Sequence, residues 1–357
     1  MGQNQKKKTV FVGLSGGVDS SVAALRLKKE GYNIVGVFIK VWHPDFLVCD
    51  WERERLDAMR VAAHLEIPFL TFDAEAVYKR EVADYMIAEY KRGRTPNPDV
   101  MCNRHVKFGA FLTFAKAHGA DYVATGHYAR VKKRKDGTVR LLRGTDHSKD
   151  QSYFLWMLTQ DELSNILFPL GASQKEEVRR EAKEHGLPTA KKRDSQGICF
   201  LGKIDLKEFL SHYISEKPGE VLDQTGNVIG CHDGAFFYTI GQRHGFTVTA
   251  EQTKRAALYV IDKDLEKNTI TVATEVPPTT DDTVRLESVN HIQRFNAAEC
   301  VEAEFRYHQR PFPVTITTTQ GDHATLVVPE DIQKPSVGQS CVLYRGDECI
   351  GGGVITE

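Results

Sequence analysis

Two cysteines of this sequence lie in surroundings that suit a reactive thiol. Cys102 is followed by the basic run "NRHVK", and Cys199 comes shortly after the basic run "KKR" at 191–193. Positive charge lowers the pKa of a nearby thiol and favours the thiolate, the form that attacks or carries sulfur. One such thiol could carry a persulfide while the other releases its sulfur. The alternative is that both are small buried hydrophobic residues, and these residues alone leave the choice open.

The cysteine pattern as a whole argues against several other kinds of site. The 7 cysteines stand at positions 49, 102, 199, 231, 300, 341 and 349, and none of them forms a CxxC pair. An odd number without CxxC disfavours a zinc site, an iron–sulfur cluster and the disulfide framework of a secreted protein. We therefore predict no metal site made by the protein's own side chains.

The run "VFVGLSGGVDSS" at 10–21 is a second stretch that could do chemistry, because it joins an apolar strand to a helix. Glycines there allow the backbone to approach a phosphate closely, and the helix start supplies unpaired N–H groups and a favourable dipole. The run contains no lysine, so it is not a Walker P-loop, and it does not fit GxGxxG. A structural turn rich in small residues is the alternative. The predicted phosphate site comprises Gly13, Leu14, Ser15, Gly16, Gly17, Val18, Asp19 and Ser20.

The elements that must position these residues alternate between strands and helices from residue 8 to about 125. Short apolar runs such as "NIVGVFI" and "IPFLTFD" predict buried strands, and helices are expected at about 75–92 and 103–118. This alternation predicts βαβ units and a parallel sheet. A hairpin is expected over 128–143, turning at Asp136-Gly137, followed by helices near 160–167 and 174–185.

The second half of the chain changes character. From about residue 257, alternating runs such as "NTITVAT" and "ATLVVP" predict the strands of a small antiparallel barrel. The predicted fold class is α/β, with an N-terminal parallel-sheet domain, a small mixed central domain and a C-terminal antiparallel β-barrel. The expected boundaries are 1–205, 206–280 and 281–357.

Composition is that of an ordinary globular protein with a core, at 357 residues, 41% hydrophobic and 27% charged. No apolar run approaches the roughly 20 residues that cross a bilayer, and the start is too weakly apolar for a signal peptide, so we expect a cytoplasmic protein without membrane contact. The net charge of −1 gives no overall basic field. Local basic runs at 132–135, 178–183 and 191–193 either bind a polyanion or are solvated faces.

Longer motifs carry a resemblance to known enzymes. The loop SGGVDSS resembles the pyrophosphate loop of the PP-loop ATPases, whose domain is adenine nucleotide alpha-hydrolase-like. The runs "GRTPNPDVMCNRHVKF", "TGHYAR", "KDQSYFL", "DSQGICF", "TIGQRHG", "FRYHQRP" and "GGGVI" resemble the tRNA-specific 2-thiouridylase family of bacteria and mitochondria, in the family's order and over nearly the whole chain. On this resemblance the fold is a PP-loop domain followed by the central domain and a tRNA-binding barrel.

The resemblance implies a tRNA-uridine 2-sulfurtransferase. ATP would adenylate the C2 oxygen of the wobble uridine and release pyrophosphate, and sulfur would then displace AMP. Cys199 resembles the family's persulfide carrier and Cys102 its catalytic nucleophile, with a transient Cys102–Cys199 disulfide; direct attack by the persulfide sulfur is the other route. Asp99 matches the acid–base residue, a role worth about 10²–10⁴-fold, although an aspartate after proline is also typical of a turn or helix cap.

The resemblance also implies binding residues and partners. With ATP and its Mg²⁺ we associate the loop Gly13–Ser20, Ile39, where the family usually has Met, and Gly126, which could instead be a plain strand-end glycine. A flipped-out uridine must expose its C2 edge, and phosphates and bases would meet basic and aromatic side chains. The implied tRNA contacts are Asn97, Pro98, Asp99, His127, Lys149, Asp150, Gln151, Arg306, Tyr307 and Gln339, some of which would otherwise be ordinary turn or strand residues.

The expected partners are tRNAs for Lys, Glu and Gln, read at the anticodon arm, and a sulfur-relay protein or a cysteine desulfurase; the expected state is a monomer. Another PP-loop ligase or amidotransferase is the alternative function, although it would not need paired cysteines. A tRNA-binding module without catalysis is disfavoured by the intact loop, both cysteines and Asp99.

Overall fold

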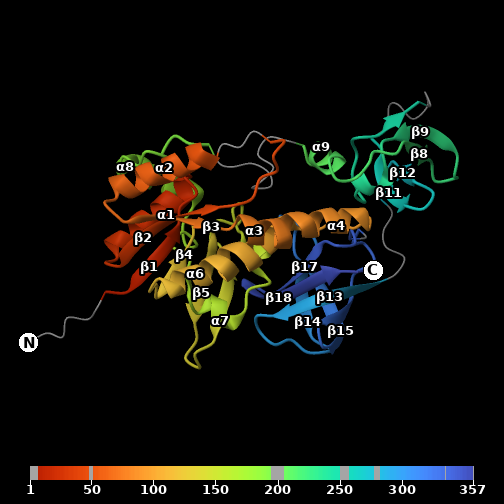
Figure 1. Ribbon diagram of the computed structural model, residues 1–357. Helices are drawn as coiled ribbons and strands as arrows, with labels where there is room; N and C mark the ends of the chain where they lie inside the picture. The colour runs from red at the N-terminus through yellow and green to blue at the C-terminus, as the bar shows by residue number, and fades with distance from the viewer. Residues whose placement is uncertain are drawn as a thin grey trace, which may run out of the picture.

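The computed structural model describes residues 7–47, 51–193, 205–249, 257–276, 282–333 and 335–356. Cys199, and with it the predicted persulfide and disulfide, lies outside the described residues, as does Cys49. Figure 1 shows the first part of the chain on the left, a small sheet at the upper right and a barrel at the lower right.

The N-terminal part is built on a five-stranded sheet in the order β3-β2-β1-β4-β7, in which all neighbours are parallel. This confirms the predicted parallel sheet. Its strands are β1 (Thr9–Gly13), β2 (Asn33–Lys40), β3 (Phe69–Asp73), β4 (Tyr122–Ala124) and β7 (Ile166–Leu167).

Helices cover both faces of this sheet because successive apolar residues of each strand point to opposite sides. Val10 and Val12 pack with α1 (Val18–Lys29), α2 (Trp51–His64) and α8 (Lys175–Glu184). Phe11 instead packs with the other face, against η2 and α6. The helices on that side and the short connections are α3 (Glu75–Tyr78), η1 (Lys79–Asp84), α4 (Tyr85–Lys91), α5 (Pro98–Met101), η2 (Cys102–Ala110), α6 (Phe111–Ala117), η3 (Ser152–Leu155) and α7 (Gln160–Leu163).

Two of the predicted helices contain an irregularity that the apolar pattern does not reveal. The helices expected at 75–92 and 103–118 are each continuous, but η1 and η2 are π-helical insertions, a feature frequent at functional sites. The helix expected at 160–167 is wrong at its end: α7 stops at Leu163, and Ile166–Leu167 pairs with β4 as the edge strand β7. This apolar pair gains a parallel neighbour that a further helical turn would not provide.

The C-terminal part is a closed antiparallel barrel, as predicted. Six strands follow the order β13-β16-β15-β14-β17-β18, and pairing of β13 with β18 closes the ring. They are β13 (Thr283–His291), β14 (Cys300–Glu304), β15 (Phe312–Gln320), β16 (His323–Val327), β17 (Ser340–Arg345) and β18 (Glu348–Ile355). The hairpin β5 (Ala129–Lys133) and β6 (Val139–Arg143) extends this sheet, because β6 pairs with β18.

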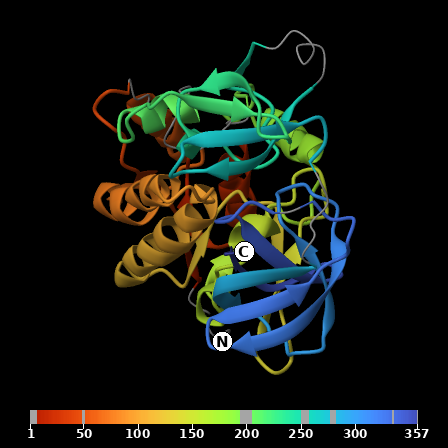
Figure 2. The same cartoon turned by 90° about the vertical axis from the view of Figure 1, so that its right-hand side faces the viewer.

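The central part is a small mixed sheet in the order β10-β9-β8-β12-β11, in which β8 and β12 are parallel and the other neighbours antiparallel. Its elements are α9 (Leu206–Ser211), β8 (Gly219–Leu222), β9 (Val228–His232), η4 (Ala235–Phe237), β10 (Thr247–Val248), β11 (Tyr259–Asp264) and β12 (Thr269–Ala273). Figures 1 and 2 show α3 and α4 under this sheet and alongside the barrel.

Shared apolar cores join the three parts. Tyr78 and Met86, on the helices, pack in one cluster with Phe209 and Val260 of the central part. Trp156 is fully buried and packs in a second cluster with the sheet of the N-terminal part and with the barrel. A Cβ added to Gly352 of β18 would lie 3.2 Å from the Trp156 ring, so the barrel backbone itself contacts the indole.

We predict that Trp156→Ala destabilises the protein by about 3–5 kcal/mol, since a large buried aromatic is replaced by a cavity between the sheet and the barrel. Urea unfolding measures the change in the free energy of unfolding. It is followed by far-UV circular dichroism, because tryptophan fluorescence would itself be altered by the substitution. Val228→Ala is the control: Val228 is 57% exposed, and its loss should stay within about 0.5 kcal/mol. Equal effects of the two substitutions would contradict the shared core.

Candidate active site

The predicted phosphate loop follows β1 and opens α1, as the sequence indicates. Ser15 and Ser20 organise it: the Ser20 hydroxyl accepts a hydrogen bond from the Ser15 amide at 3.2 Å and donates to the Gly17 carbonyl at 3.3 Å. Gly16 has φ +71°, and a Cβ there would lie 2.5 Å from the Glu54 carbonyl oxygen, so this position requires glycine. Ser15 is exposed and Gly17 half-buried, which leaves the loop accessible to an anion.

The other two predicted nucleotide residues lie beside this loop. A Cβ added to Gly126, just beyond β4, would lie 2.7 Å from the Ser20 amide nitrogen and 2.8 Å from the Asp19 carbonyl carbon. Gly126 is therefore a close-approach glycine rather than a plain strand end. The side chain of Ile39, on β2, lies 3.6 Å from where a Cβ on Gly13 would be. The carboxyl ends of three neighbouring strands thus surround one site.

Asp19 is held in place by residues from distant parts of the chain. Lys175 Nζ lies 2.8 and 2.7 Å from the two Asp19 carboxylate oxygens, and the Tyr128 hydroxyl donates to one of them at 2.9 Å. Tyr128 in turn exchanges hydrogen bonds with Gln151, whose side-chain oxygen accepts from the Tyr128 amide at 3.0 Å. The loop is thereby connected to the predicted tRNA segment at Lys149–Gln151.

Asp99 and Cys102 begin the helix that runs through α5, η2 and α6. Asn97 caps it, since its side-chain oxygen accepts from the Val100 amide at 3.3 Å, and Pro98 occupies the first helical position, where its missing N–H costs nothing. Cys102 is 3% exposed and belongs to the apolar cluster shared with the central part. The sequence offered two predictions for Asp99, a turn or helix-cap residue and an acid–base group. The observed helix start is compatible with both.

The segment before this cap is fixed by both other parts of the chain. The Thr95 amide donates to the Val337 carbonyl at 2.8 Å, and its hydroxyl lies 3.0 Å from the Thr239 hydroxyl. Gln339 donates from its side chain to the Thr95 carbonyl at 3.0 Å. Arg94 forms ion pairs with Glu89 at 2.7 Å and with Glu287 of the barrel.

Burial shifts the pKa values of Asp99 and His127 in opposite directions. Burial raises the pKa of the Asp99 carboxyl, and the positive charge of Lys107 partly opposes this rise. Burial, together with Lys107, lowers the pKa of His127 well below its usual value. His127 is 8% exposed, hydrogen-bonds to the Thr125 hydroxyl at 2.7 Å and packs on the ring of Phe108, so it is neutral at pH 7.

The basic run after Cys102 does not act as one charged group. Arg104 is paired with Glu162 of α7, and burial lowers the pKa of His105. Of the run's cations, Lys107 is the one whose charge acts on both Asp99 and His127. On the other side, Lys192, shortly before the segment that carries Cys199, forms an ion pair with Asp57 of α2 at 3.0 Å.

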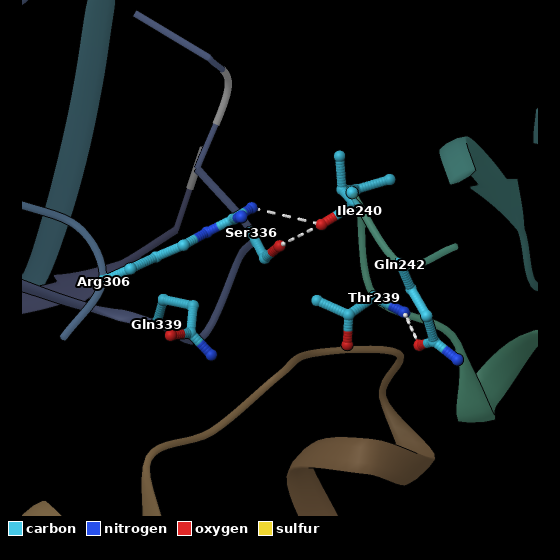
Figure 3. Close-up of a pocket in the computed structure, with 7 residues that line it drawn as sticks. Thr239, Ile240, Gln242, Arg306, Ser336 and Gln339 are labelled. Atoms are coloured by element: carbon cyan, nitrogen blue, oxygen red, sulfur yellow. Dashed lines mark hydrogen bonds between the residues drawn. The ribbon is translucent and has the colours of Figure 1, made fainter. Parts of the chain in front are cut away.

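A pocket of about 390 Å³ lies where the central part, the barrel and the Thr95 segment meet (Figure 3). Arg306 and Gln339, both predicted from the sequence, line it, and the Arg306 guanidinium donates to the Ile240 carbonyl at 3.2 Å. Sequence reasoning missed the lining by Thr239, Gln242 and Ser336. The motif "TIGQRHG" at 239–245 was the available signal, since it contains two of them.

The remaining predicted tRNA contacts fall into two kinds. Tyr307 is 36% exposed and stacks on His308 with ring centroids 3.8 Å apart, as suits an aromatic surface. Asp150 is 6% exposed, and its carboxylate accepts from the Gly144 amide at 2.8 Å and the Ser152 hydroxyl at 2.9 Å, so it shapes the local turn. Lys149 and Gln151 beside it are half-buried.

Two further findings bear on the kind of site. Within the described ranges, no group of three or more His, Cys, Asp or Glu side chains is placed to hold a metal ion. Among the same residues, no helix is long and apolar enough to cross a membrane.

Comparison with known families matches three consecutive parts of the chain. A tRNA methyl transferase HUP domain matches residues 8–203, a tRNA methyl transferase PRC-barrel domain matches 207–274, and an aminomethyltransferase beta-barrel domain matches 281–355.

Similar proteins extend over the whole chain. A "tRNA-specific 2-thiouridylase MnmA" from Bacillus licheniformis is 44% identical over 365 residues, covering 100% of this chain and 97% of the relative. One of the same name from Listeria monocytogenes is 44% identical over 361 residues, covering 99% and 96%. Among solved structures, a 4-thiouridine synthetase–RNA complex with bound ATP is 22% identical with a TM-score of 0.38, covering 55% of this chain and 46% of that one.

We predict that Asp99→Asn is more stable than the wild type at pH 7 and that the difference disappears near pH 3. Because burial raises the folded-state pKa of Asp99, ionising it opposes folding. That cost is absent below the pKa of the unfolded chain, about 3.9, and is complete above the folded-state pKa. Urea unfolding at pH 3, 5 and 7 measures it.

Asp223→Asn provides a control of opposite sign. Hydrogen bonds from Thr225 and Asn227 lower the pKa of Asp223 to about 2, so this carboxylate stabilises the fold above pH 4 and its contribution is lost as the pH falls toward 2. Asp223→Asn is therefore expected to be the less stable variant at pH 7. A pH-independent difference between Asp99→Asn and the wild type would contradict the prediction for Asp99.

Proposed function

The chain belongs to the tRNA-specific 2-thiouridylase family, and from that premise we propose that it replaces the C2 oxygen of a tRNA wobble uridine by sulfur in an ATP-dependent reaction. One observation carries the assignment to these residues. Gly126 lies against the phosphate loop, and the next residue, His127, packs on Phe108 of the helix that begins with Asp99 and Cys102. Activation by a nucleotide and attack by a thiol are therefore served by adjacent elements.

ATP is assigned to the loop Gly13–Ser20, with Ile39 and Gly126 beside the nucleotide. Exposed Ser15 and the half-buried Gly17 suit phosphate oxygens, and the Asp19 carboxylate at the same loop suits the hard, oxygen-preferring Mg²⁺ that accompanies ATP. The magnesium nucleotide would supply the adenylyl group, with pyrophosphate as its leaving group. The chain's own task is to hold the phosphates at the sheet edge and to admit the uridine oxygen beside them.

The uridine is assigned to the start of the Cys102 helix. Asn97, Pro98 and Asp99 present a capped helix start to the base, and the raised pKa of Asp99 suits a group that takes up and returns a proton. Neutral His127 contributes a polar, uncharged edge next to the same helix. Adenylation converts the C2 oxygen into a leaving group, and departure of AMP follows attack by sulfur on C2.

Sulfur delivery is assigned to Cys199 and Cys102. The Cys199 persulfide would hold the transferable sulfur, supplied by a relay protein or a cysteine desulfurase. In one route the Cys102 thiolate attacks the inner sulfur, a Cys102–Cys199 disulfide forms, hydrosulfide leaves to attack C2, and an external thiol later reduces the disulfide. In the other route the terminal persulfide sulfur attacks C2 directly.

The tRNA body is assigned to the barrel and the Lys149–Gln151 turn. Arg306 and Gln339 at the 390 Å³ pocket, with Tyr307 beside it, combine a cation, an amide and an aromatic surface, a set that suits phosphate and base contacts. Wobble uridines of tRNAs for Lys, Glu and Gln are the proposed targets. Such a substrate places the protein's action in the cytoplasm, and we expect it to act as a monomer.

We predict that wild type, given unmodified tRNA, ATP, magnesium and a persulfide source, forms 2-thiouridine and that Cys102→Ser and Cys199→Ser do not. Mass spectrometry of the nucleosides provides the readout. Cys231 and Cys300 are exposed thiols on β9 and β14, so Cys231→Ser and Cys300→Ser should retain activity. AMP formation by wild type without thiolation would preserve the ATP site and favour a PP-loop ligase instead.

We predict that Arg306→Gln weakens tRNA binding. The negative slope of log affinity against log salt concentration should become shallower by about 1, because one phosphate contact is lost. Filter binding over a salt series measures the slope. Lys116→Gln, which removes an exposed charge on α6, is the control and should leave the slope unchanged. Identical slopes for Arg306→Gln and wild type would remove Arg306 from the tRNA surface.

A further inference from the structure

We infer that Lys175 is the phosphate-binding cation that the loop itself lacks. The loop between β1 and α1 contains no lysine, unlike a P-loop, in which a lysine reaches the β and γ phosphates. The fold brings a lysine to the same place from the first turn of α8, 156 positions further along the chain than Asp19. This inference rests on the proposed function, in which the loop holds ATP.

The contact between Lys175 and the loop is specific. Lys175 Nζ lies 2.8 and 2.7 Å from the two carboxylate oxygens of Asp19, so the ammonium is centred on the carboxylate. The Lys175 side chain is 10% exposed and that of Asp19 is 32% exposed. The Lys175 side chain is therefore largely enclosed by protein, and its ammonium ends at the more exposed Asp19 carboxylate in the first turn after the loop.

Neighbouring groups fix the direction of this side chain. The Lys175 amide donates to the Asp146 carboxylate at 3.0 Å, which anchors the backbone at the start of α8. Nζ lies 5.6 Å from the centre of the Tyr128 ring, a distance at which the ring face attracts a cation. Tyr128 also donates to Asp19 at 2.9 Å. Lys175 is thus held toward the loop before any nucleotide arrives, which lowers the entropy cost of binding.

The position of the lysine is unfavourable on local grounds, which argues for a role in binding. Helix N-termini carry partial positive charge and favour acidic residues in their first turn. Lys175 is the first residue of α8, and its ammonium lies against the first turn of α1, so it faces positive dipole ends. Asp19 offsets this cost, and bound phosphates would offset it further. Departures from local rules of this kind are expected at functional sites.

A purely structural role for the Lys175–Asp19 pair is disfavoured because other contacts already join α1 to α8. Arg26 of α1 donates to Glu181 at 2.9 Å, to the Ser173 hydroxyl at 2.6 Å and to the Pro169 carbonyl at 3.1 Å. These bonds lie at the other end of α1, away from the loop. Removing Lys175 therefore leaves the packing of the two helices supported.

The test measures binding of ATP, pyrophosphate and adenosine by calorimetry, without tRNA or turnover. A charge-assisted hydrogen bond contributes about 1.5–3 kcal/mol, so Lys175→Met is expected to weaken ATP and pyrophosphate binding roughly 10- to 150-fold by that figure. Adenosine affinity should be unchanged, because adenosine has no phosphate for the lysine to contact. Lys175→Arg keeps the charge and should recover much of the ATP affinity.

Arg26→Met is the matched control, because it breaks the α1–α8 contacts at the end of α1 away from the loop. It should lower the unfolding temperature more than Lys175→Met does and leave ATP affinity at the wild-type level. The inference is overturned if Lys175→Met binds ATP as tightly as wild type, or if it weakens adenosine and ATP equally. A wild-type protein that binds neither ATP nor pyrophosphate would instead remove the proposed function of the loop.

Discussion

The hydrogen bonds around Thr95 are the constraint on which the geometry of the site depends. Through its amide and carbonyl Thr95 contacts Val337 and Gln339 beside the barrel, and through its hydroxyl it contacts Thr239 of the central part. Two residues later Asn97 caps the helix that carries Asp99 and Cys102. The start of that helix is therefore positioned by all three parts of the chain together. Docking of the barrel and of the central part thus contributes directly to the geometry of this site.

The same dependence explains what the sequence could and could not predict. Parallel strands, the phosphate loop and the barrel follow from local patterns of apolar residues and glycines, because each pattern acts within one element. The ends of α7 and β7 did not follow, since Ile166–Leu167 becomes a strand through pairing with β4. The contacts of Lys175 with Asp19 and of Thr95 with Thr239 are likewise invisible to any local pattern, because their partners are far apart in sequence.

The predicted site residues also differ in whether local chemistry alone could identify them. Gly16 is predictable from chemistry, since a backbone that must approach another closely requires glycine. Gly126 was predicted from the resemblance, and the geometry supplies the same reason there. The tRNA contacts are different, because their prediction came from motifs. Among them Asp150 shows how a motif can point to a residue whose carboxylate is used internally, to hold Gly144 and Ser152.

The burial of Cys102 constrains the sulfur chemistry that we propose at this helix. At 3% exposure, within an apolar cluster that includes Phe237 and Tyr238 of the central part, the Cys102 thiol is closed to solvent and to a base approaching from outside. The proposed attack by Cys102 would therefore need this cluster to open locally. The pocket at Thr239 and Arg306 lies nearby, between the central part and the barrel. Under the proposed function, a tRNA that contacts Arg306 and Gln339 would meet the residue whose side chain also holds Thr95. Gln339 thereby joins the proposed tRNA surface to the segment that leads into the cap of the Cys102 helix.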